Sequence, residues 1–400
     1  MSSGWRLVCG LCAEACDDAE SFACESCGGP VIVRHTRLPA KLATTGVAGL
    51  WRYRGWLPLT KDARAVTLGE GATPLVRCER WPPAAGLQCV YAKLEFAGPT
   101  GSFKDRGASV LVSHAVSHGV TRVVEDSSGN AGAAIAAYAA CAGLACQIFA
   151  PAATPPSKLS QIRAYGANLI AVEGSREAVA AAARAAAIAT GDNAASHDVY
   201  YASHNSNPYF VEGAKTLAFE LVEQLGDAPD HIVLPVGGGS LFCGIALALK
   251  ELSASGLIRA RPRLHLVQST GCMPLVAAFE RGALVPLAGE RYPTIAGGIV
   301  IDNPHRGALI LRMLRETGGC AVGVADDEIL AAQRDVARLE GIYMEPTSAV
   351  AFAGLLRLVA MGTVASHESV VVPVTGSGLK DSRTSIPLSS RYSASAASDT

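Results

Sequence analysis

The chain has 400 residues and a formal net charge of −1; half of its residues are apolar and 17% are charged. A charge near zero gives no electrostatic attraction to nucleic acid or to an anionic membrane, so we expect neither as a partner. A chain of this length exceeds what one hydrophobic core usually organises, and the composition predicts two α/β lobes. No signal-peptide pattern opens the chain and the Ala-rich stretch 178–189 contains Arg184, so we expect a soluble, cytoplasmic protein.

Residues 1–35 form a cysteine-rich module with two CxxC pairs. Residues 13–23 separate the pairs, which is typical of the two knuckles of a zinc ribbon. Because so short a segment has almost no core, we expect a structural zinc ion to hold it, with two disulfides or a metal-free ribbon as the alternatives. Cys16 is left over and could compete as a ligand. The predicted metal ligands are Cys9, Cys12, Cys24 and Cys27.

Strands and helices alternate along the rest of the chain, which predicts parallel sheets with right-handed crossovers. The Ser-rich residues 386–400 show no hydrophobic rhythm and are expected to be a flexible tail. The expected strands are 90–94, 120–125, 146–150, 168–172, 231–235, 261–268 and 369–374, and the expected helices are 105–118, 133–142, 157–165, 177–190 and 210–225.

Lys104 lies in the run GPTGSFKDRG, residues 98–107, between the first of these strands and the helix that follows. A lysine framed by glycines, with a hydroxyl two residues before it, has the setting of a Schiff-base lysine that binds an aldehyde cofactor. Taken alone, a lysine beside an Asp-Arg pair is more often a solvated helix start. Its companions in the other loops favour the cofactor site.

Glycine-rich and hydroxyl-rich loops follow other predicted strands, at the carboxyl edge where parallel sheets bind ligands. The loop Gly237-Gly238-Gly239-Ser240 opens a helix and presents backbone amides suited to a phosphate. Glycine runs also bind dinucleotides, but the spacing expected of that fingerprint is absent here, which favours a lone phosphate.

Two further loops complete the predicted site. In the first, at residues 127–130, the serine hydroxyls and the helix-terminal amides could receive a substrate carboxylate, and the asparagine could donate to a phenolate oxygen. The alternative is a simple helix N-cap. The second ends a buried strand with Thr375, whose hydroxyl could bond an unprotonated pyridine nitrogen or could simply stabilise a turn. The first loop consists of Ser127, Ser128, Gly129 and Asn130.

The motifs GEGATPL, GPTGSFKDRG, SSGNAG, PVGGGS and VTGSG occur in this order between about residues 65 and 380. Together they resemble the fold-type II pyridoxal phosphate enzymes, and among these the threonine synthase group, some of which carry a cysteine-rich amino-terminal segment. The resemblance implies an α/β fold with two open parallel-sheet lobes, like that of the tryptophan synthase β subunit, and a homodimer. It divides the chain into the module at 1–35, a large cofactor-binding lobe at 36–106 and 216–385, and a small lobe at 107–215.

The same resemblance implies a role for each loop residue. Lys104 would bind pyridoxal 5'-phosphate covalently and remove the substrate α-proton, and Phe103 would pack beside the cofactor ring. Asn130 would contact the phenolic oxygen and Thr375 the ring nitrogen. The remaining implied roles are cofactor phosphate binding by Gly237, Gly238, Gly239 and Ser240, and substrate carboxylate binding by Ser127, Ser128 and Gly129.

One position departs from the family pattern. Phe210 stands where threonine synthases carry an arginine that would bind the phosphate of O-phosphohomoserine; Lys61, Arg106 or Lys215 could substitute for it. The sequence therefore predicts a lyase that converts O-phosphohomoserine and water to threonine and phosphate. The alternatives are β-elimination or β-replacement on serine or phosphoserine, as in dehydratases, cysteine synthase and cysteate synthase, or a non-catalytic interaction protein.

Overall fold

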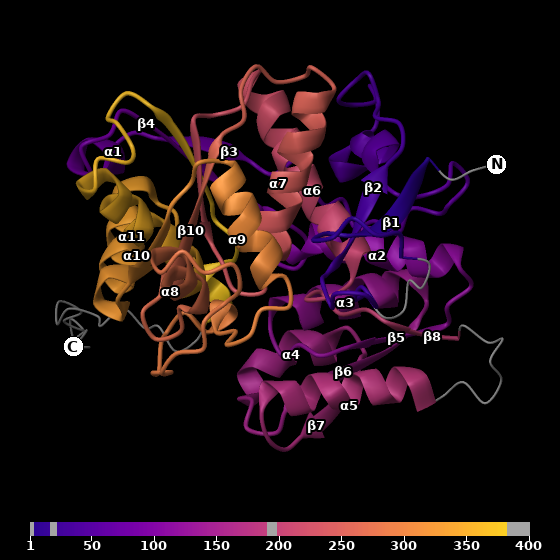
Figure 1. Cartoon of the computed structure of the whole chain (residues 1–400). Coiled ribbons are helices and arrows are strands. Elements are labelled where there is room, and N and C mark those ends of the chain that lie inside the picture. Colours follow the sequence, from indigo (N-terminus) through magenta and orange to yellow (C-terminus); the bar gives the residue numbers. More distant parts are fainter. Residues whose placement is uncertain (1–3, 17–21, 190–197, 382–400) are drawn as a thin grey trace, which may run out of the picture.

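The computed structural model describes residues 4–16, 22–189 and 198–381, which form two parallel sheets with flanking helices and a small amino-terminal hairpin (Figure 1). The predicted tail, 386–400, lies outside the described residues. No helix in the described ranges is long and apolar enough to cross a membrane. The α/β fold with parallel sheets agrees with the expectation from the alternating pattern.

The larger sheet has six strands in the order β11-β10-β9-β12-β4-β3, all parallel except β3, which runs antiparallel to β4. Its central strands are buried on both faces. In β9, Ile232 and Leu234 contact one hydrophobic cluster while Val233 contacts the other, as the two-residue period of a strand requires. The strands are β3 (Leu75–Cys78), β4 (Cys89–Lys93), β9 (His231–Pro235), β10 (Arg263–Ser269), β11 (Ala321–Val324) and β12 (Ser369–Pro373).

Helices cover both faces of this sheet. One face packs against α6, α7, α8 and α9, and the other against α1, α10 and α11. The region 269–368, which the sequence patterns left unassigned, supplies four of these helices and strand β11. The helices are α1 (Trp81–Ala84), α6 (Pro208–Leu225), α7 (Ser240–Ala254), α8 (Pro274–Glu280), α9 (Gly307–Glu316), α10 (Asp326–Glu340) and α11 (Pro346–Ala360).

The smaller sheet is fully parallel, with the order β7-β6-β5-β8. The alanine-rich helix α3 packs closely on it: a methyl group at Gly132 would lie 1.9 Å from the carbonyl oxygen of Ser127. This sheet and its helices are β5 (Arg122–Glu125), β6 (Ala145–Pro151), β7 (Asn168–Val172), β8 (Val199–Tyr201), α2 (Lys104–Ser117), α3 (Asn130–Ala142), α4 (Pro156–Ala164) and α5 (Arg176–Ala189).

Every strand and helix expected from the sequence has its counterpart, with ends that differ by a few residues; 168–172 and 231–235 match β7 and β9. The largest difference lies at α3, which begins at Asn130 and not at residue 133. Gly132 has a low helix propensity, but the helix includes it because no larger residue would fit so close to the Ser127 carbonyl oxygen.

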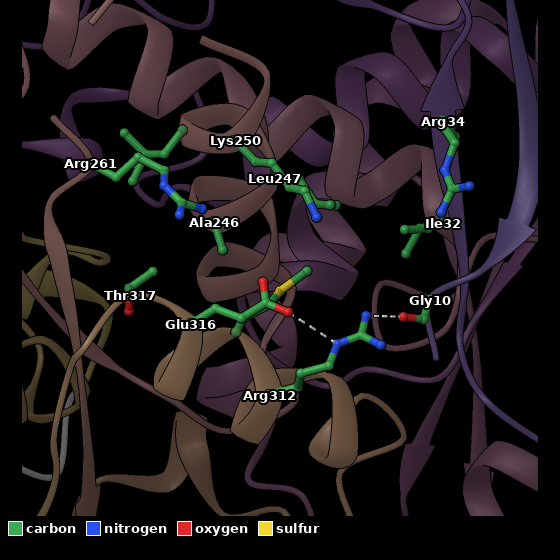
Figure 2. A pocket seen from close by; sticks show the side chains of 12 residues that line it. Gly10, Ile32, Arg34, Ala246, Leu247, Lys250, Arg261, Arg312, Glu316 and Thr317 are labelled. Atoms are coloured by element: carbon green, nitrogen blue, oxygen red, sulfur yellow. Dashed lines mark hydrogen bonds and ion pairs between the residues drawn. The ribbon is translucent and has the colours of Figure 1, made fainter. Parts of the chain in front are cut away.

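The cysteine-rich module forms an antiparallel hairpin of β1 (Trp5–Cys9) and β2 (Val31–His35). A cavity of about 60 Å³ separates it from α7 and α9, and Figure 2 shows Arg312 of α9 reaching across toward the module. The Arg312 guanidinium donates to the carbonyl oxygens of Gly10 and Leu11 and pairs with Glu316 at 3.5 Å. Arg312 therefore links the cysteine-rich module to α9 through hydrogen bonds.

Candidate active site

A cavity of about 410 Å³ opens among loops that follow strands of both sheets. All the residues predicted for the cofactor and for the substrate carboxylate line this one cavity, although their loops come from four distant parts of the sequence. Their convergence follows from the parallel sheets, whose carboxyl ends face the same space. The shared residues are Phe103, Lys104, Ser127, Ser128, Gly129, Asn130, Gly237, Gly238, Gly239, Ser240 and Thr375.

Lys104 is the first residue of α2, and the preceding loop is shaped by Asp105. The Asp105 carboxylate accepts hydrogen bonds from the Thr100 hydroxyl at 2.6 Å and from the Thr100 N–H at 3.0 Å. The Lys104 Nζ lies 4.5 Å from the centroid of the Phe103 ring. Burial lowers the pKa of Lys104 to about 7. A large share of the amine is thus unprotonated near neutral pH, as condensation with an aldehyde requires.

The loop between β9 and α7 has the shape of a phosphate cradle. A side chain at Gly237 would meet the Ile299 backbone at 2.8 Å, one at Gly238 would meet Asn205 Oδ1 at 2.2 Å, and Gly239 has φ +81°. The backbone N–H groups of the three glycines donate to no acceptor in the described part of the chain. With the N-terminus of α7 behind them, they can bind an anion.

Asn130 begins α3 and donates from Nδ2 to both carboxylate oxygens of Glu345, at 3.1 and 3.2 Å. A methyl group at Gly376 would lie 2.4 Å from the Glu345 Cδ, so the loop after β12 passes directly over this carboxylate. Burial raises the pKa of Glu345. Glu345 was not foreseen from the sequence; its position immediately before Pro346, at the start of α11, was the available signal.

Thr375 has a hydrogen-bond partner, Ser348, that the sequence did not indicate. Its hydroxyl lies 2.9 Å from Ser348 Oγ, and its carbonyl oxygen accepts the Phe103 N–H at 3.0 Å. Thr375 lines the cavity, and the fully buried Ser348 lies behind it, so the two hydroxyls form a neutral hydrogen-bonded pair. A neutral pair can bond a ring nitrogen without favouring its protonation, as a carboxylate would.

The loop before α3 is not a side-chain N-cap. Gly129 occupies the N-cap position and no side chain makes a capping hydrogen bond there. The Ser127 hydroxyl accepts the Gly129 N–H at 3.3 Å, and both serines of the loop line the cavity. The arrangement leaves hydroxyls and amides available for a ligand.

Phe210 lies next to the predicted cofactor lysine, with its ring centroid 5.5 Å from the Lys104 Nζ. Phe210 is fully buried, does not line the cavity, and packs so closely that a methyl group at Gly107 would lie 2.5 Å from its ring. None of the three proposed substitute cations lies in the cavity either: Lys61 is exposed elsewhere, Arg106 is paired with Glu95, and Lys215 is paired with glutamates of α6 and α7.

Two other cations line the cavity. The side chains of Lys158 in α4 and Arg176 in α5 make no hydrogen bond or close ion pair with any residue that the structure describes. Arg176 interacts electrostatically with Glu125 and Glu177 without a close ion pair to either within the described residues. Lys158 lies close to the opposite wall, since a methyl group at Gly297 would be 4.0 Å from its Nζ. Lys380 also lines the cavity, but it donates to the Thr100 carbonyl oxygen at 2.6 Å. Lys158 and Arg176 can therefore receive an anionic group of a ligand.

The four predicted zinc ligands lie together at the end of the hairpin. Their sulfur atoms are all within 4.8 Å of one another, with Cys9–Cys27 at 3.4 Å and Cys12–Cys24 at 3.7 Å. All four are free thiols, so the alternative of two disulfides does not describe this structure. Cys16 lies outside the group, and its Sγ donates to the Glu14 carbonyl oxygen.

Comparison with known proteins places this site in a family. Residues 66–376 match the family described as pyridoxal-phosphate dependent enzyme. The threonine synthase of Methanosarcina acetivorans is 37% identical over 96% of this chain and 94% of its own length. The threonine synthase of Methanocaldococcus jannaschii is 36% identical over 93% of this chain and 92% of its own length. The chain belongs to the threonine synthase family. It is accordingly a pyridoxal phosphate-dependent lyase, which excludes a solely non-catalytic role.

Solved structures show the fold of this family member. The processed threonine deaminase isoform 2 of Solanum lycopersicum superposes with a TM-score of 0.65 at 23% identity, covering 76% of this chain and 79% of its own. Maize serine racemase superposes with a TM-score of 0.65 at 24% identity, covering 76% of this chain and 88% of its own. The side-chain-free cradle and the lowered pKa of Lys104 fit the phosphate and the aldehyde of the family's cofactor.

Proposed function

We propose that this chain is a threonine synthase that converts O-phosphohomoserine and water to threonine and phosphate. The observation that supports this best is the joint occurrence, in one cavity, of a low-pKa lysine, a backbone phosphate cradle and a separate cation pair. One anion site serves the cofactor, and the cation pair gives the substrate phosphate a site of its own. The near full-length similarity to threonine synthases supports the same substrate.

Each wall of the cavity then has a task. Pyridoxal phosphate, when bound, withdraws electrons from the substrate α-carbon and so acidifies its proton. Lys104 holds the cofactor and, once released, accepts that proton at Nζ. The Gly237–Ser240 loop would hold the cofactor phosphate, Thr375 would bond the ring nitrogen, and Asn130 would bond the phenolic oxygen. Phe103 packs beside the ring.

The substrate lies on the side of the small sheet in this proposal. The loop Ser127–Gly129 receives its carboxylate through hydroxyls and helix-terminal amides. Its phosphate lies between Lys158 and Arg176, in place of the arginine that the family pattern has at position 210. Neither side chain forms a close ion pair within the described residues, so both can bond a dianion.

The same cavity also supports a second candidate function, β-elimination or β-replacement on phosphoserine or serine. Two departures from the threonine synthase pattern favour it: position 210 carries Phe and not the phosphate-binding arginine, and the phosphate loop reads GGGS and not the asparagine-containing form common in that group. Incubation of the holoenzyme with O-phosphohomoserine and, separately, with O-phosphoserine distinguishes the two. Threonine and phosphate from the first substrate alone support our proposal, whereas phosphate from O-phosphoserine alone would replace it with the second candidate.

The cysteine module is proposed to bind one structural zinc ion. Four thiolates around zinc at about 2.3 Å place the sulfur atoms a little under 4 Å apart, close to the separations observed here. Metal analysis should find about one zinc per chain, and Cys24→Ser should lower thermal stability more than turnover; Cys16→Ser is the matched control. A metal-free protein whose melting is unaffected by chelators would refute the zinc site.

A further inference from the structure

A buried histidine and a buried glutamate form a pair at the edge of the active-site cavity. His204 follows β8 and lines the cavity, and Glu125 is the last residue of β5. The His204 Nδ1 lies 2.6 Å from Glu125 Oε1, and the His204 backbone N–H donates to Glu125 Oε2 at 3.2 Å. The two bonds fix both the position and the orientation of the imidazole ring. The sequence patterns did not single out either residue.

The other ring nitrogen of His204 faces the cavity. Nε2 has no hydrogen-bond partner among the described residues. It is also accessible to solvent, because it is absent from the set of unpaired polar atoms that are shielded from solvent. The side chain is 8% exposed, and the space that it borders is the cavity. A ring nitrogen that is accessible while its partner is held by a carboxylate has the geometry of a proton-transfer group.

The charges around the pair favour its uncharged form. Burial raises the pKa of Glu125, with Asp126 adding to the effect and Lys104 opposing it. Burial lowers the pKa of His204, and so do the nearby cations Lys104, Arg176 and Arg306. When a protonated Glu125 donates to Nδ1, the neutral imidazole carries its own proton on Nε2, directed at the cavity.

We propose that His204, backed by Glu125, is the group that exchanges a proton with the oxygen that leaves and the water that enters the substrate side chain. This inference rests on the proposed function, because it requires a substrate that loses an oxygen leaving group in this cavity. Lys104 serves the α-carbon, so the more distant oxygen needs a second proton-transfer group.

The proton balance closes over the two steps. In O-phosphohomoserine the oxygen leaves the γ-carbon and water adds at the β-carbon, so the β-carbon must also lose a proton and the γ-carbon must gain one; Lys104 carries this proton. The electron pair left on the β-carbon forms the carbon–carbon double bond as the phosphate departs with the pair of the carbon–oxygen bond. In this step the Nε2 proton moves to the departing oxygen and the Glu125 proton moves to Nδ1. As water adds, a new carbon–oxygen bond forms, the water proton moves to Nε2, and the Nδ1 proton returns to Glu125. The pair ends in its starting state, with no oxidant or reductant required.

Other titratable residues of the cavity wall are less suited to this task. Glu345 accepts two hydrogen bonds from Asn130, and Lys380 donates to a backbone carbonyl. Lys158 and Arg176 carry the charge that the substrate phosphate needs, and a guanidinium does not release its proton.

The test separates proton exchange at the α-carbon from loss of the leaving group. Wild-type holoenzyme, His204→Gln and the exposed-site control His118→Gln are incubated in D₂O with O-phosphohomoserine, and with O-phosphoserine as a second probe. Deuterium at the α-carbon is followed by NMR, together with phosphate release and the cofactor absorbance. His204→Gln should keep α-exchange within about threefold and lose about 10²-fold or more in phosphate release, whereas His118→Gln should match wild type.

Every other outcome decides against the inference. Unchanged phosphate release in His204→Gln, or an equal loss of exchange and release, would show that the histidine is only structural. If His204→Gln fails to bind cofactor, Glu125→Gln decides: about a tenfold slower release with retained exchange is expected, and unchanged release overturns the role. Absence of α-exchange in wild type with both substrates would instead overturn the proposed function, and this inference with it.

Discussion

The structure adds the location of the Phe210 side chain to what the sequence indicates about this position. In the sequence it reads as a lost phosphate ligand, but its ring is buried against Gly107 and lies 5.5 Å from the Lys104 amine. An arginine here would place a guanidinium in a site that now holds a fully buried ring. In the proposed function, the substrate phosphate is bound instead by Lys158 and Arg176, which line the cavity on the small-sheet side.

Phe210→Arg is consequently expected to destabilise the protein and not to improve phosphate binding. Burial of an unpaired charge should lower the free energy of unfolding by about 3–5 kcal/mol. Phe210→Leu, which only shortens the side chain, should cost about 1–2 kcal/mol. Urea unfolding of both variants checks this, and a stable Phe210→Arg protein with a lower KM for O-phosphohomoserine would contradict the account.

Lys104 gives a pH dependence with a definite sign. Its pKa is lowered from 10.5 to about 7, so protonation removes the reactive amine only below neutral pH. The rate of covalent cofactor uptake by the apoprotein should rise about tenfold per pH unit from pH 5 to pH 6.5 and level off above about pH 7.5.

Stopped-flow absorbance measures this uptake. Lys104→Ala, which cannot form the covalent bond, is the control for titration of the cofactor itself. A rate that keeps rising to pH 9 or beyond would indicate an ordinary, solvated lysine and contradict the burial of this amine.

The sequence could predict the loop residues of the site because each carries a recognisable pattern of glycines and hydroxyls after a strand. It could not predict Glu345, Ser348, Arg176 or His204. Each of these depends on which helix or strand end lies opposite the cofactor loops, and that is decided by the packing of two sheets. A single glutamate or histidine in a sequence has no signal of comparable strength.

At the scale of elements, a buried ion network positions the helix that begins with Lys104. Arg106 of α2 bonds Glu95 at 2.7 Å and Glu220 of α6 at 3.1 Å, and Glu220 also accepts from Lys93 of β4 at 2.6 Å. All four side chains are at most 1% exposed. The network joins α2, α6 and the large sheet, which fixes the cofactor lysine relative to the Thr375 loop.

Removing the shared acid should therefore unfold the protein more easily. Burial raises the pKa of Glu220, but Arg106 and Lys93 more than offset this and hold it below its usual range. Glu220→Ala should cost about 3–5 kcal/mol because it leaves the buried Lys93 without an ion-pair partner among the described residues and Arg106 with Glu95 alone. The exposed Glu316→Ala, which removes a surface ion pair, should cost about 0.5 kcal/mol. Equal midpoints of chemical denaturation for the two variants would refute the role of the network.

At the scale of the whole molecule, α2 connects the two sheets because it packs against both α3 and α6 (Figure 1). The alternation of strands and helices was sufficient to predict parallel sheets. The order of the strands was not, since β4 and β12 are neighbours although residues 94–368 lie between them in the sequence. Pairings of that range depend on the closed core and leave no local pattern in the sequence. The assignment of lobe boundaries from the family resemblance stays a prediction.

The central claim is that Lys104 carries the cofactor in this cavity. Borohydride reduction of the purified holoenzyme, followed by peptide mapping, tests it most directly because reduction makes the lysine–cofactor bond permanent. We predict a phosphopyridoxyl group on the peptide that contains Lys104 and its absence from Lys104→Ala. A label on another lysine, such as Lys158 or Lys380, or no label at all, would contradict the account.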